Sequence, residues 1–376
     1  MRIECKAGSL MSAIETVRRV VNPVAAKEQY RFMKLTASDS GRCLLAASDG
    51  ETTIQTAVKD VSIVQTGGVM LPYVKFHDVV RLADPEAVAA VDGNADAVHF
   101  LQGKNRFRLL TMPSARLETV LLRTSDFGFE TTSENFAALV DKVSFAVDDN
   151  SLRAAADSVL VKMEGGVLTL VATDLRRMAL AAAQVESPRD FAYIVPEGVL
   201  KIAALSAPKK AMLEVGFASD RHIRFASGDF VLQSLLVEGK FPPYDKITSR
   251  LPGLKSRDTA STSAAELVAA CRQALLCYPD DSSTNVVRLT FGDNVIDVST
   301  IDVGGKHRAS IGVAATYSGP QREICVDPRY ITNALQKGAD PKKKIHVDHC
   351  GDRMPLVIRG KSFRYILMPV VPPSGR

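Results

Sequence analysis

Residues 171–185 read VATDLRRMALAAAQV, and two adjacent arginines interrupt this otherwise apolar run. The stretch begins with Val171 and Ala172 and becomes apolar again from Met178, as buried strands do. Such segments, when Gly or Asp turns separate them, are typical of antiparallel strands. The stretch therefore predicts strand structure around a polar turn, and its arginines need an explanation.

The surrounding sequence repeats one plan three times. Three helices are predicted to open at Ser9, Ser133 and Ser263, each with apolar residues on one face. At the third opening, Glu266 follows Ser263 by three residues, which is the pattern of a capping box.

Two further sets of landmarks recur with these openings. A second helix is predicted after a proline in each third, at Pro72, Pro196 and Pro328. An alternating strand surrounds a phenylalanine late in each third, at Phe107, Phe230 and Phe363. From the first third to the second, the serine, proline and phenylalanine positions advance by 124, 124 and 123 residues. From the second third to the last, they advance by 130, 132 and 133 residues, so three independent landmarks indicate the same repeat.

The repeat predicts an α+β fold of three domains, each with two helices and antiparallel sheets. The predicted domains are 1–124, 125–255 and 256–376 with a short C-terminal tail, and turn residues place linkers at 125–130 and 251–258.

Composition excludes several classes of protein. The chain has 376 residues, is 46% hydrophobic and carries a net charge of +5, with no apolar run long enough to span a membrane. The N-terminus has no signal-type apolar segment, which predicts a cytoplasmic protein. The six cysteines form no C-x-x-C pair and are expected to be reduced and mostly packed.

No motif predicts catalysis, a metal or a cofactor. The GKS at 360–362 lacks the glycine of a P-loop, because Pro355 stands in its place, and a strand follows it instead of a helix. His346, His349 and Cys350 have no second ligand pair at matching spacing. We therefore expect a non-catalytic protein whose function depends on its shape.

Three segments, in order, resemble the bacterial DNA sliding clamp, the beta subunit of DNA polymerase III. VATDLRRMA resembles the family's A-T-D-G-H-R-L-A signature, VEGKFPPYDKI its D-G-x-F-P-D-Y-x-x-V segment, and YILMPV its terminal Y-V-V-M-P-M. The likeness extends from the N-terminus to Val370, and the three repeats coincide with the family's three domains.

The resemblance implies a head-to-tail homodimer, in which six domains form a ring around duplex DNA without reading its sequence. The residues expected to face DNA are Arg18, Arg19, Lys75, Arg81, Lys142, Asn150, Lys201, Arg272, Arg329 and Lys337. Ordinary solvated helix charges would explain about half of the basic ones. Phe107 and Leu109 are expected to pack against Leu275 and Leu276 of the second copy.

The resemblance also implies a pocket between the second and third domains for short apolar peptides of polymerase and clamp loader subunits. The matching positions are Ala156, Thr173, Leu175, Arg176, Arg177, Met178, Pro242, Lys246, Ile247, Ile366, Met368, Pro369 and Val370. Arg177 would then support the pocket wall, and together with Arg176 and Lys246 it would form the rim. The alternative for Arg177 is an edge-strand arginine that blocks sheet aggregation.

Several positions depart from the family pattern. Leu175 stands where the family has glycine, Arg176 where it has histidine, Ala156 where it has leucine and Lys246 where it has arginine. These departures leave open a diverged ring that serves repair or a mobile element instead of the main replisome. An enzyme with an unrecognised site is the other alternative.

Overall fold

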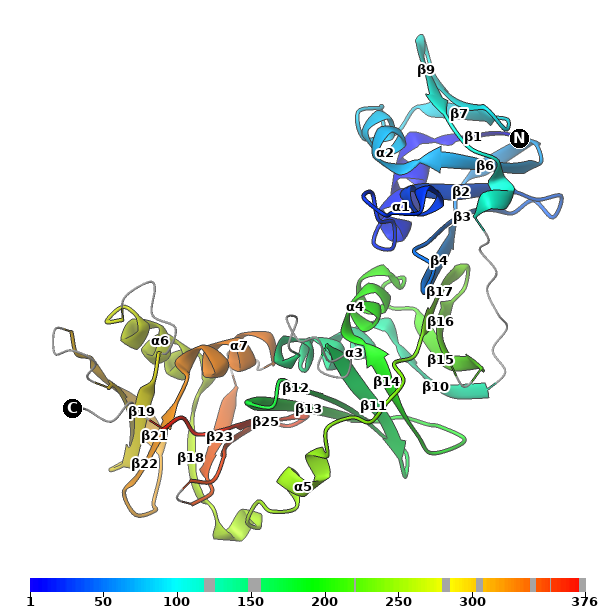
Figure 1. Cartoon of the computed structure of the whole chain (residues 1–376). Helices are drawn as coiled ribbons and strands as arrows, with labels where there is room; N and C mark the ends of the chain where they lie inside the picture. Colours follow the sequence, from blue (N-terminus) through cyan, green and yellow to red (C-terminus); the bar gives the residue numbers. More distant parts are fainter. Residues whose placement is uncertain are drawn as a thin grey trace. The chain divides into compact units, whose positions relative to one another are not determined.

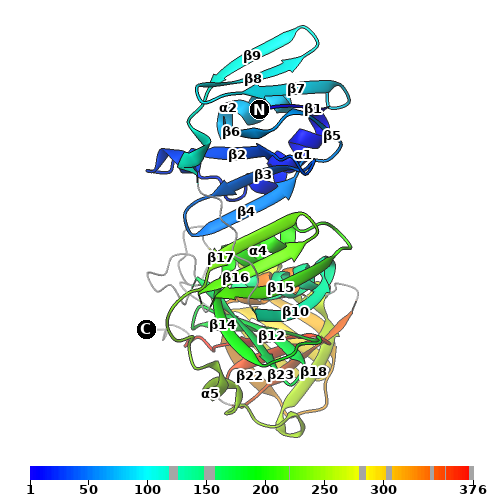
Figure 2. The same cartoon turned by 90° about the vertical axis from the view of Figure 1, so that its right-hand side faces the viewer.

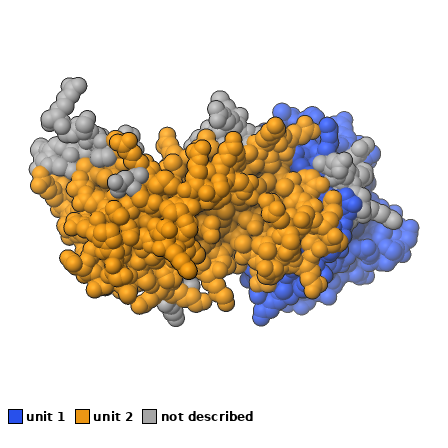
Figure 3. All heavy atoms as spheres, turned by 90° about the horizontal axis from the view of Figure 1, so that it is seen from below, with its two compact units in different colours: residues 1–134, 198–236 blue, residues 135–197, 237–376 orange. Residues whose placement is uncertain are grey.

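The structure is a computed structural model that describes residues 1–117, 126–147, 157–219, 221–278, 285–301, 307–338, 343–351 and 353–371. The chain forms two compact units, coloured separately in Figure 3. Unit 1 comprises residues 1–134 and 198–236, and unit 2 comprises 135–197 and 237–376. In the described part of the chain, no helix is both long and apolar enough to cross a membrane.

Unit 1 contains two antiparallel sheets and the helices α1 (Ala7–Val17) and α2 (Tyr73–Arg81). The five-stranded sheet has the order β5 (Val61–Gln65), β1 (Arg2–Lys6), β7 (Val88–Gly93), β8 (Ala97–Gln102) and β9 (Asn105–Leu110). The eight-stranded sheet has the order β10 (Asp126–Thr132), β15 (Met212–Ser219), β16 (His222–Ser227), β17 (Phe230–Leu235), β4 (Thr52–Ala57), β3 (Cys43–Ser48), β2 (Phe32–Ala37) and β6 (Gly67–Pro72). The short 3-10 helices η1 (Glu28–Arg31) and η2 (Ser114–Arg116) contact β2 and β6 of this sheet, respectively. Helix α4 (Glu197–Ser206) begins at the unit boundary.

Unit 2 is built on one twelve-stranded antiparallel sheet (Figure 1). Its order is β14 (Phe191–Pro196), β11 (Ser158–Glu164), β12 (Val167–Thr173), β13 (Arg177–Gln184), β25 (Phe363–Leu367), β24 (Leu356–Arg359), β23 (Lys344–His349), β18 (Asp258–Ser263), β21 (Ser310–Thr316), β20 (Val295–Thr300), β19 (Val287–Gly292) and β22 (Arg322–Val326). Its helices are α3 (Ser133–Asp141), η3 (Ser144–Ala146), α5 (Tyr244–Thr248), η4 (Leu254–Ser256), α6 (Ala264–Leu275) and α7 (Pro328–Gly338). The first two residues of α3 fall in unit 1.

The unit boundary runs through the predicted middle domain because the strands of that domain join two different sheets. β17 pairs with β4, which continues the sheet of the first third of the chain. β13 pairs with β25, which continues the sheet of the last third. The domain boundaries at 124 and 255 therefore stay a prediction from the sequence.

The predicted helices are confirmed in each third. α1, α3 and α6 open at or within two residues of Ser9, Ser133 and Ser263, and the Ser263 hydroxyl accepts a hydrogen bond from the Glu266 backbone N–H at 3.4 Å. α2 and α4 begin directly after Pro72 and Pro196, and α7 begins with Pro328. The antiparallel sheets with paired helices confirm the α+β class.

One predicted linker is wrong. Residues 126–130, taken as part of a linker because turn residues cluster there, belong to β10, which pairs with β15 along its length. Phe129 is fully buried in that strand, so burial of the aromatic side chain outweighs the local turn preference.

Aromatic and aliphatic side chains fill both cores. In unit 1, Leu10 and Ile14 of α1 are fully buried, and Phe76 of α2 meets Phe100 of β8 edge to face, with ring centroids 6.1 Å apart. In unit 2, the fully buried Tyr365 ring stacks on Phe363 at 4.7 Å. The amphipathic helices thus cover the sheets with their apolar faces.

Unit 2 also buries a carboxylate. Asp348 of β23 is fully buried and accepts hydrogen bonds from Arg257 at 3.1 Å, Arg359 at 2.9 Å and Thr259 at 3.0 Å. These three donors from neighbouring segments compensate the desolvation of the charge and fix their register.

Burial keeps three cysteine thiols protonated. It raises the pKa of Cys5 to about 11 and the pKa of Cys43 and of Cys271 to about 12, and all six cysteines are free, as predicted. Because the thiolate is the nucleophile, we expect these three thiols to resist a thiol reagent at pH 8 in the folded protein and to react after unfolding. Mass spectrometry of the labelled sites checks this, with the partly exposed Cys277 as the internal control. Native labelling of Cys271 as fast as Cys277 would contradict it.

Candidate functional site

The turn between β12 and β13 is fixed by side chain to backbone hydrogen bonds. The Thr173 hydroxyl donates to the Arg177 carbonyl at 2.7 Å and accepts from the Leu175 N–H at 3.0 Å. One oxygen of Asp174 accepts from the N–H groups of Arg176 and Arg177 at 2.9 and 2.8 Å. Asp and Thr side chains stabilise tight turns in this way, so this turn has one defined shape.

Arg177 packs inside unit 2. Its Nε donates to Asp174 at 3.0 Å, and its guanidinium lies 4.7 Å from the ring centre of Tyr330 and 5.6 Å from that of Phe145. The side chain is only 11% exposed. These contacts hold the turn against α7 and η3, since a cation is attracted to an aromatic face.

The edge-strand alternative for Arg177 is therefore wrong. β13 lies between β12 and β25 and hydrogen-bonds to both, so it has no open edge to protect. The arginine at a central strand supports the turn instead, and it does not belong to the exposed rim predicted with Arg176 and Lys246.

Leu175 occupies a backbone conformation that normally favours glycine. Its φ is +71° and its side chain is 59% exposed at the tip of the turn. A side chain at positive φ crowds its own carbonyl, which costs roughly 1–2 kcal/mol. The sequence departure at this position thus places an apolar group on the surface at a conformational cost.

An apolar cluster lies beside this turn in unit 2. Its buried members are Leu160, Val171, Met178, Ile194, Leu251, Cys350, Val357 and Ile366. Ile247 of α5 packs against it with Phe241 and Tyr244. Met178 and Ile366 are only 4% and 1% exposed, so these two predicted pocket residues form the floor beneath the surface rather than an exposed wall. Pro242 is half-buried and Lys246 is exposed next to them in sequence.

The C-terminal segment forms one side of a cavity of about 420 Å³. Met368, Pro369 and Val370 line it together with Arg176. The Met368 N–H donates to the Arg176 carbonyl at 2.9 Å, and the Val370 N–H donates to the Cys325 carbonyl at 2.8 Å. Met368 remains 40% exposed, so its thioether is accessible to a ligand.

The opposite side of this cavity consists of residues that the sequence did not predict for it. Asp327, Arg329 and Tyr330 come from the start of α7, and Asn285 and Val286 precede β19. In the sequence, Val326-Asp327-Pro328 predicts the start of a helix, but it does not predict which segments pack next to that helix. Ten of the thirteen predicted pocket positions thus belong to the turn, the apolar cluster or the cavity in unit 2. Pro242 and Lys246 lie next to Ile247 in sequence, and Ala156 lies outside the described residues.

Most of the residues predicted to face DNA lie exposed on helices. Arg18 and Arg19 follow α1, Lys75 and Arg81 lie on α2, Lys201 on α4, Arg272 on α6 and Lys337 near the end of α7. Lys142 is half-buried and donates to Ser362 at 2.8 Å, and Asn150 lies outside the described residues.

Arg329 differs from this group. Its Nε and Nη2 donate to the two carboxylate oxygens of Asp327 at 3.0 and 2.6 Å, and it lines the cavity of the C-terminal segment. The Asp327 carboxylate partly neutralises the Arg329 guanidinium, and the assignment of Arg329 to the DNA face stays a prediction.

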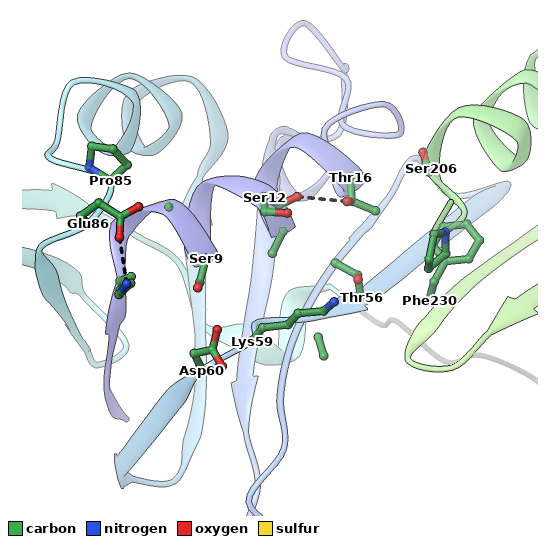
Figure 4. Close-up of a pocket in the computed structure, with 15 residues that line it drawn as sticks. Ser9, Ser12, Thr16, Thr56, Lys59, Asp60, Pro85, Glu86, Ser206 and Phe230 are labelled. Carbon is green, nitrogen blue, oxygen red and sulfur yellow. Dashed lines mark hydrogen bonds and ion pairs between the residues drawn. The ribbon is translucent and has the colours of Figure 1, made fainter. Parts of the chain in front are cut away.

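Unit 1 has a separate cavity of about 450 Å³ along α1. Figure 4 shows Ser9, Ser12 and Thr16 on α1, with Lys59 and Asp60 from the turn after β4 below the helix. Lys6 also lines the cavity and is paired with Glu86 at 2.8 Å. Two lysines and two carboxylates balance, so this polar cavity has no net charge that would select an anion.

The residues predicted for the dimer interface lie on an edge strand and at the end of a helix. Phe107, 41% exposed, and the half-buried Leu109 lie on β9, an edge strand of the five-stranded sheet. Leu276, 84% exposed, follows the half-buried Leu275 at the end of α6. An uncovered edge strand with apolar side chains is a surface for pairing.

No cluster of three or more His, Cys, Asp or Glu side chains suited to a metal occurs among the described residues.

Comparison with known proteins gives one consistent family. The N-terminal and central domain models of the DNA polymerase III beta subunit match residues 1–121 and 130–243. The beta sliding clamp of Vibrio cholerae is 28% identical over 297 residues, which cover 77% of this chain and 78% of that one.

Solved structures match the fold over nearly the whole chain. The Bacillus subtilis sliding clamp superposes with a TM-score of 0.89 at 20% identity, covering 99% of both chains. A Pseudomonas aeruginosa sliding clamp bound to griselimycin also has a TM-score of 0.89, at 21% identity and 99% coverage of both chains.

The positive φ of Leu175 yields a prediction that two variants test. Leu175→Gly and Leu175→Ala both remove the side chain, but only glycine adopts this conformation without crowding. We expect the glycine variant to be the more stable by about 1 kcal/mol, the reverse of the usual order, in denaturant unfolding. Equal stability, or a more stable alanine variant, would show that the turn does not hold this conformation.

Proposed function

This chain belongs to the family of the DNA polymerase III beta subunit, and from that premise we propose how it acts as a sliding clamp in DNA replication. A sliding clamp is a non-catalytic subunit that tethers a polymerase to its template. The observation that carries this function is that two family models and the clamp fold together extend over the chain from residue 1 to its last strand. We place the protein in the cytoplasm, where replication takes place.

The proposed ring consists of two chains joined head to tail, with the domains 1–124, 125–255 and 256–376 in each. Head-to-tail contacts between different surfaces form a closed ring when the rotations that relate successive copies add up to a full turn. The edge strand β9 with Phe107 and Leu109 would meet Leu275 and Leu276 at the end of α6 of the second copy. Burying such side chains contributes roughly 1.5–3 kcal/mol each.

Duplex DNA is the proposed partner inside the ring. Arg18, Arg19, Lys75, Arg81 and Arg272 are exposed on or next to helices and would contact phosphates. Two of these charges are shared with neighbouring carboxylates, since Arg18 lies 2.6 Å from Glu15 and Arg81 lies 3.8 Å from Asp78. Contacts of this kind are weak and independent of sequence, which permits sliding.

The proposed partner-peptide site is the surface between the Thr173–Arg177 turn and the C-terminal segment. Its accessible apolar groups are Leu175, Met368 and Val370, above the floor formed by Met178 and Ile366. A thioether adapts to different apolar ligands, and a contiguous apolar surface with basic neighbours is typical of a binding site. Arg176 and Lys246 would contact polar peptide groups at the rim.

The exposed Leu175 favours a second candidate function. Because Leu175 and Arg176 replace the family's glycine and histidine at the turn, the peptide preference of this chain differs from the usual one. A clamp that serves repair or a mobile element would be recognised by binding repair polymerase peptides in preference to replicative ones.

The ring makes a topological prediction. Protein loaded on closed circular DNA should stay bound at high salt and dissociate when the circle is cut, because only a closed circle retains a ring. The double variant Leu275→Asp, Leu276→Asp should sediment as a monomer and lose retention. Leu254→Asp, at an exposed leucine outside the proposed interface, is the control and should behave as wild type. Equal retention on circular and linear DNA would contradict sliding.

The peptide site makes a second prediction. In calorimetry with a short apolar peptide from a polymerase or loader subunit, and with griselimycin as a second probe, Met368→Ala should weaken binding about tenfold. A chain that ends after Leu367 should lose binding while it remains dimeric. Met212→Ala, at a methionine of similar exposure in unit 1, is the matched control. Unchanged binding after truncation would show that the site lies elsewhere.

A further inference from the structure

Unit 1 contains a second copy of the turn that shapes the proposed peptide site. In this copy, one carboxylate oxygen of Asp49 accepts from the N–H groups of Glu51 and Thr52 at 2.9 and 2.7 Å. The Ser48 hydroxyl donates to the Thr52 carbonyl at 3.1 Å and accepts from the Gly50 N–H at 3.2 Å. These are the same four hydrogen bonds that fix the turn before β13, and Gly50, like Leu175, has a positive φ of 102°.

The strand pairing beside the two turns is also the same. In unit 1, Thr53 of β4 pairs with Gln233 of β17, and in unit 2, Met178 of β13 pairs with Ile366 of β25. Figure 2 shows β3, β4, β17 and β16 side by side in unit 1. The turn and the strand pairing next to the proposed peptide site therefore occur once in each unit.

The side chains on the two floors have opposite character. In unit 2 they are Leu160, Val171, Met178, Val357 and Ile366. The strand registers place Lys34, Ala46, Thr53, Arg224 and Gln233 at the matching positions of unit 1. An apolar floor in one unit is thus a polar floor in the other, so the unit 1 site is unsuited to an aliphatic anchor.

A cavity of about 440 Å³ lies on this polar floor, and we call it the polar groove. Thr53 and Gln233 line it from the floor, and Ser48 and Glu51 line it from the turn. Tyr30 of η1, Arg116 of η2 and His222 of β16 line its other sides. Its volume is in the range of pockets that bind small ligands or single peptide side chains with their backbone.

The amide oxygen of Gln233 has no hydrogen-bond partner among the described residues. The residue is 6% exposed, and this oxygen is buried. A buried amide that forms no hydrogen bond costs about 1–3 kcal/mol, and native proteins rarely leave one so. A ligand in the polar groove would satisfy it.

We propose that the polar groove is a second binding site of this chain, for an extended peptide segment that inserts an Asn or Gln side chain. A carboxamide has one acceptor and two donors, which complement the acceptor and donors of Gln233. The described lining residues include one carboxylate, Glu51, one guanidinium, Arg116, and the imidazole of His222, so neither sign of charge dominates and a neutral anchor fits. This site is independent of the proposed apolar peptide site in unit 2.

The test uses a random heptapeptide library displayed on phage and panned against the full-length Met368→Asp chain, in which the apolar site is disabled. We expect enriched peptides to share Asn or Gln at one position. A synthetic enriched peptide should bind the wild-type chain, and exchange of its Asn or Gln for Leu should weaken binding at least tenfold. Enrichment of aliphatic anchors only, or of no peptide, would overturn the proposal.

Protein variants locate the bound peptide. Gln233→Leu should weaken it at least tenfold, whereas Gln55→Leu, the same change on β4 outside the groove, should leave its affinity unchanged. The double variant Thr53→Met, Gln233→Ile carries the side chains of the Met178–Ile366 pair of unit 2 and should also lose binding. This variant replaces Gln233→Leu in the test if Gln233→Leu does not fold. Circular dichroism and sedimentation verify folding. Undiminished binding to a folded variant of either kind would overturn the assignment.

Discussion

The pairing of β13 with β25 is the constraint on which unit 2 depends. It joins residues 177–181 to 363–367, almost two hundred positions apart, and makes one continuous sheet from strands of two repeats. Because this register pairs Arg177 with Leu367, the turn at Leu175 and the segment at Met368 lie next to each other. β4 and β17 do the same in unit 1, which explains why the middle repeat divides between two compact units.

Within that frame, the two adjacent arginines have different tasks. Arg177 is anchored by Asp174 and stacked between Tyr330 and Phe145, so its charge and shape hold the turn against the helical layer. Arg176, one residue earlier, points to the cavity beside Met368. Arg176 lies in the turn before β13 and Arg177 is the first residue of that strand, so the first arginine lines the cavity and the second contributes to packing.

The two grooves show how a repeated backbone can acquire two specificities. Hydrogen bonds from Asp49 and Asp174 set the same turn, and the strand registers set the same floor positions. The side chains on the floor differ in polarity, and these decide whether a ligand must offer apolar surface or hydrogen bonds. Binding chemistry here resides in a few substitutions on a preserved frame, as is general for sites on common folds.

The sequence by itself determined the α+β class, the helix starts and the repeat, because capping residues, prolines and alternation act over a few positions. The Ser263 cap and the strands around Phe107, Phe230 and Phe363 were readable for this reason. The sequence also located most of the candidate site through family motifs, including Leu175 and Met368. What the tertiary structure alone decided was the burial of Ile366 and Met178, the role of Arg177, the Asp327 and Tyr330 side of the cavity, and the amide oxygen of Gln233 left without a partner among the described residues. Each depends on segments more than a hundred residues apart, and local patterns carry no information about which distant strand or helix packs against a given side chain.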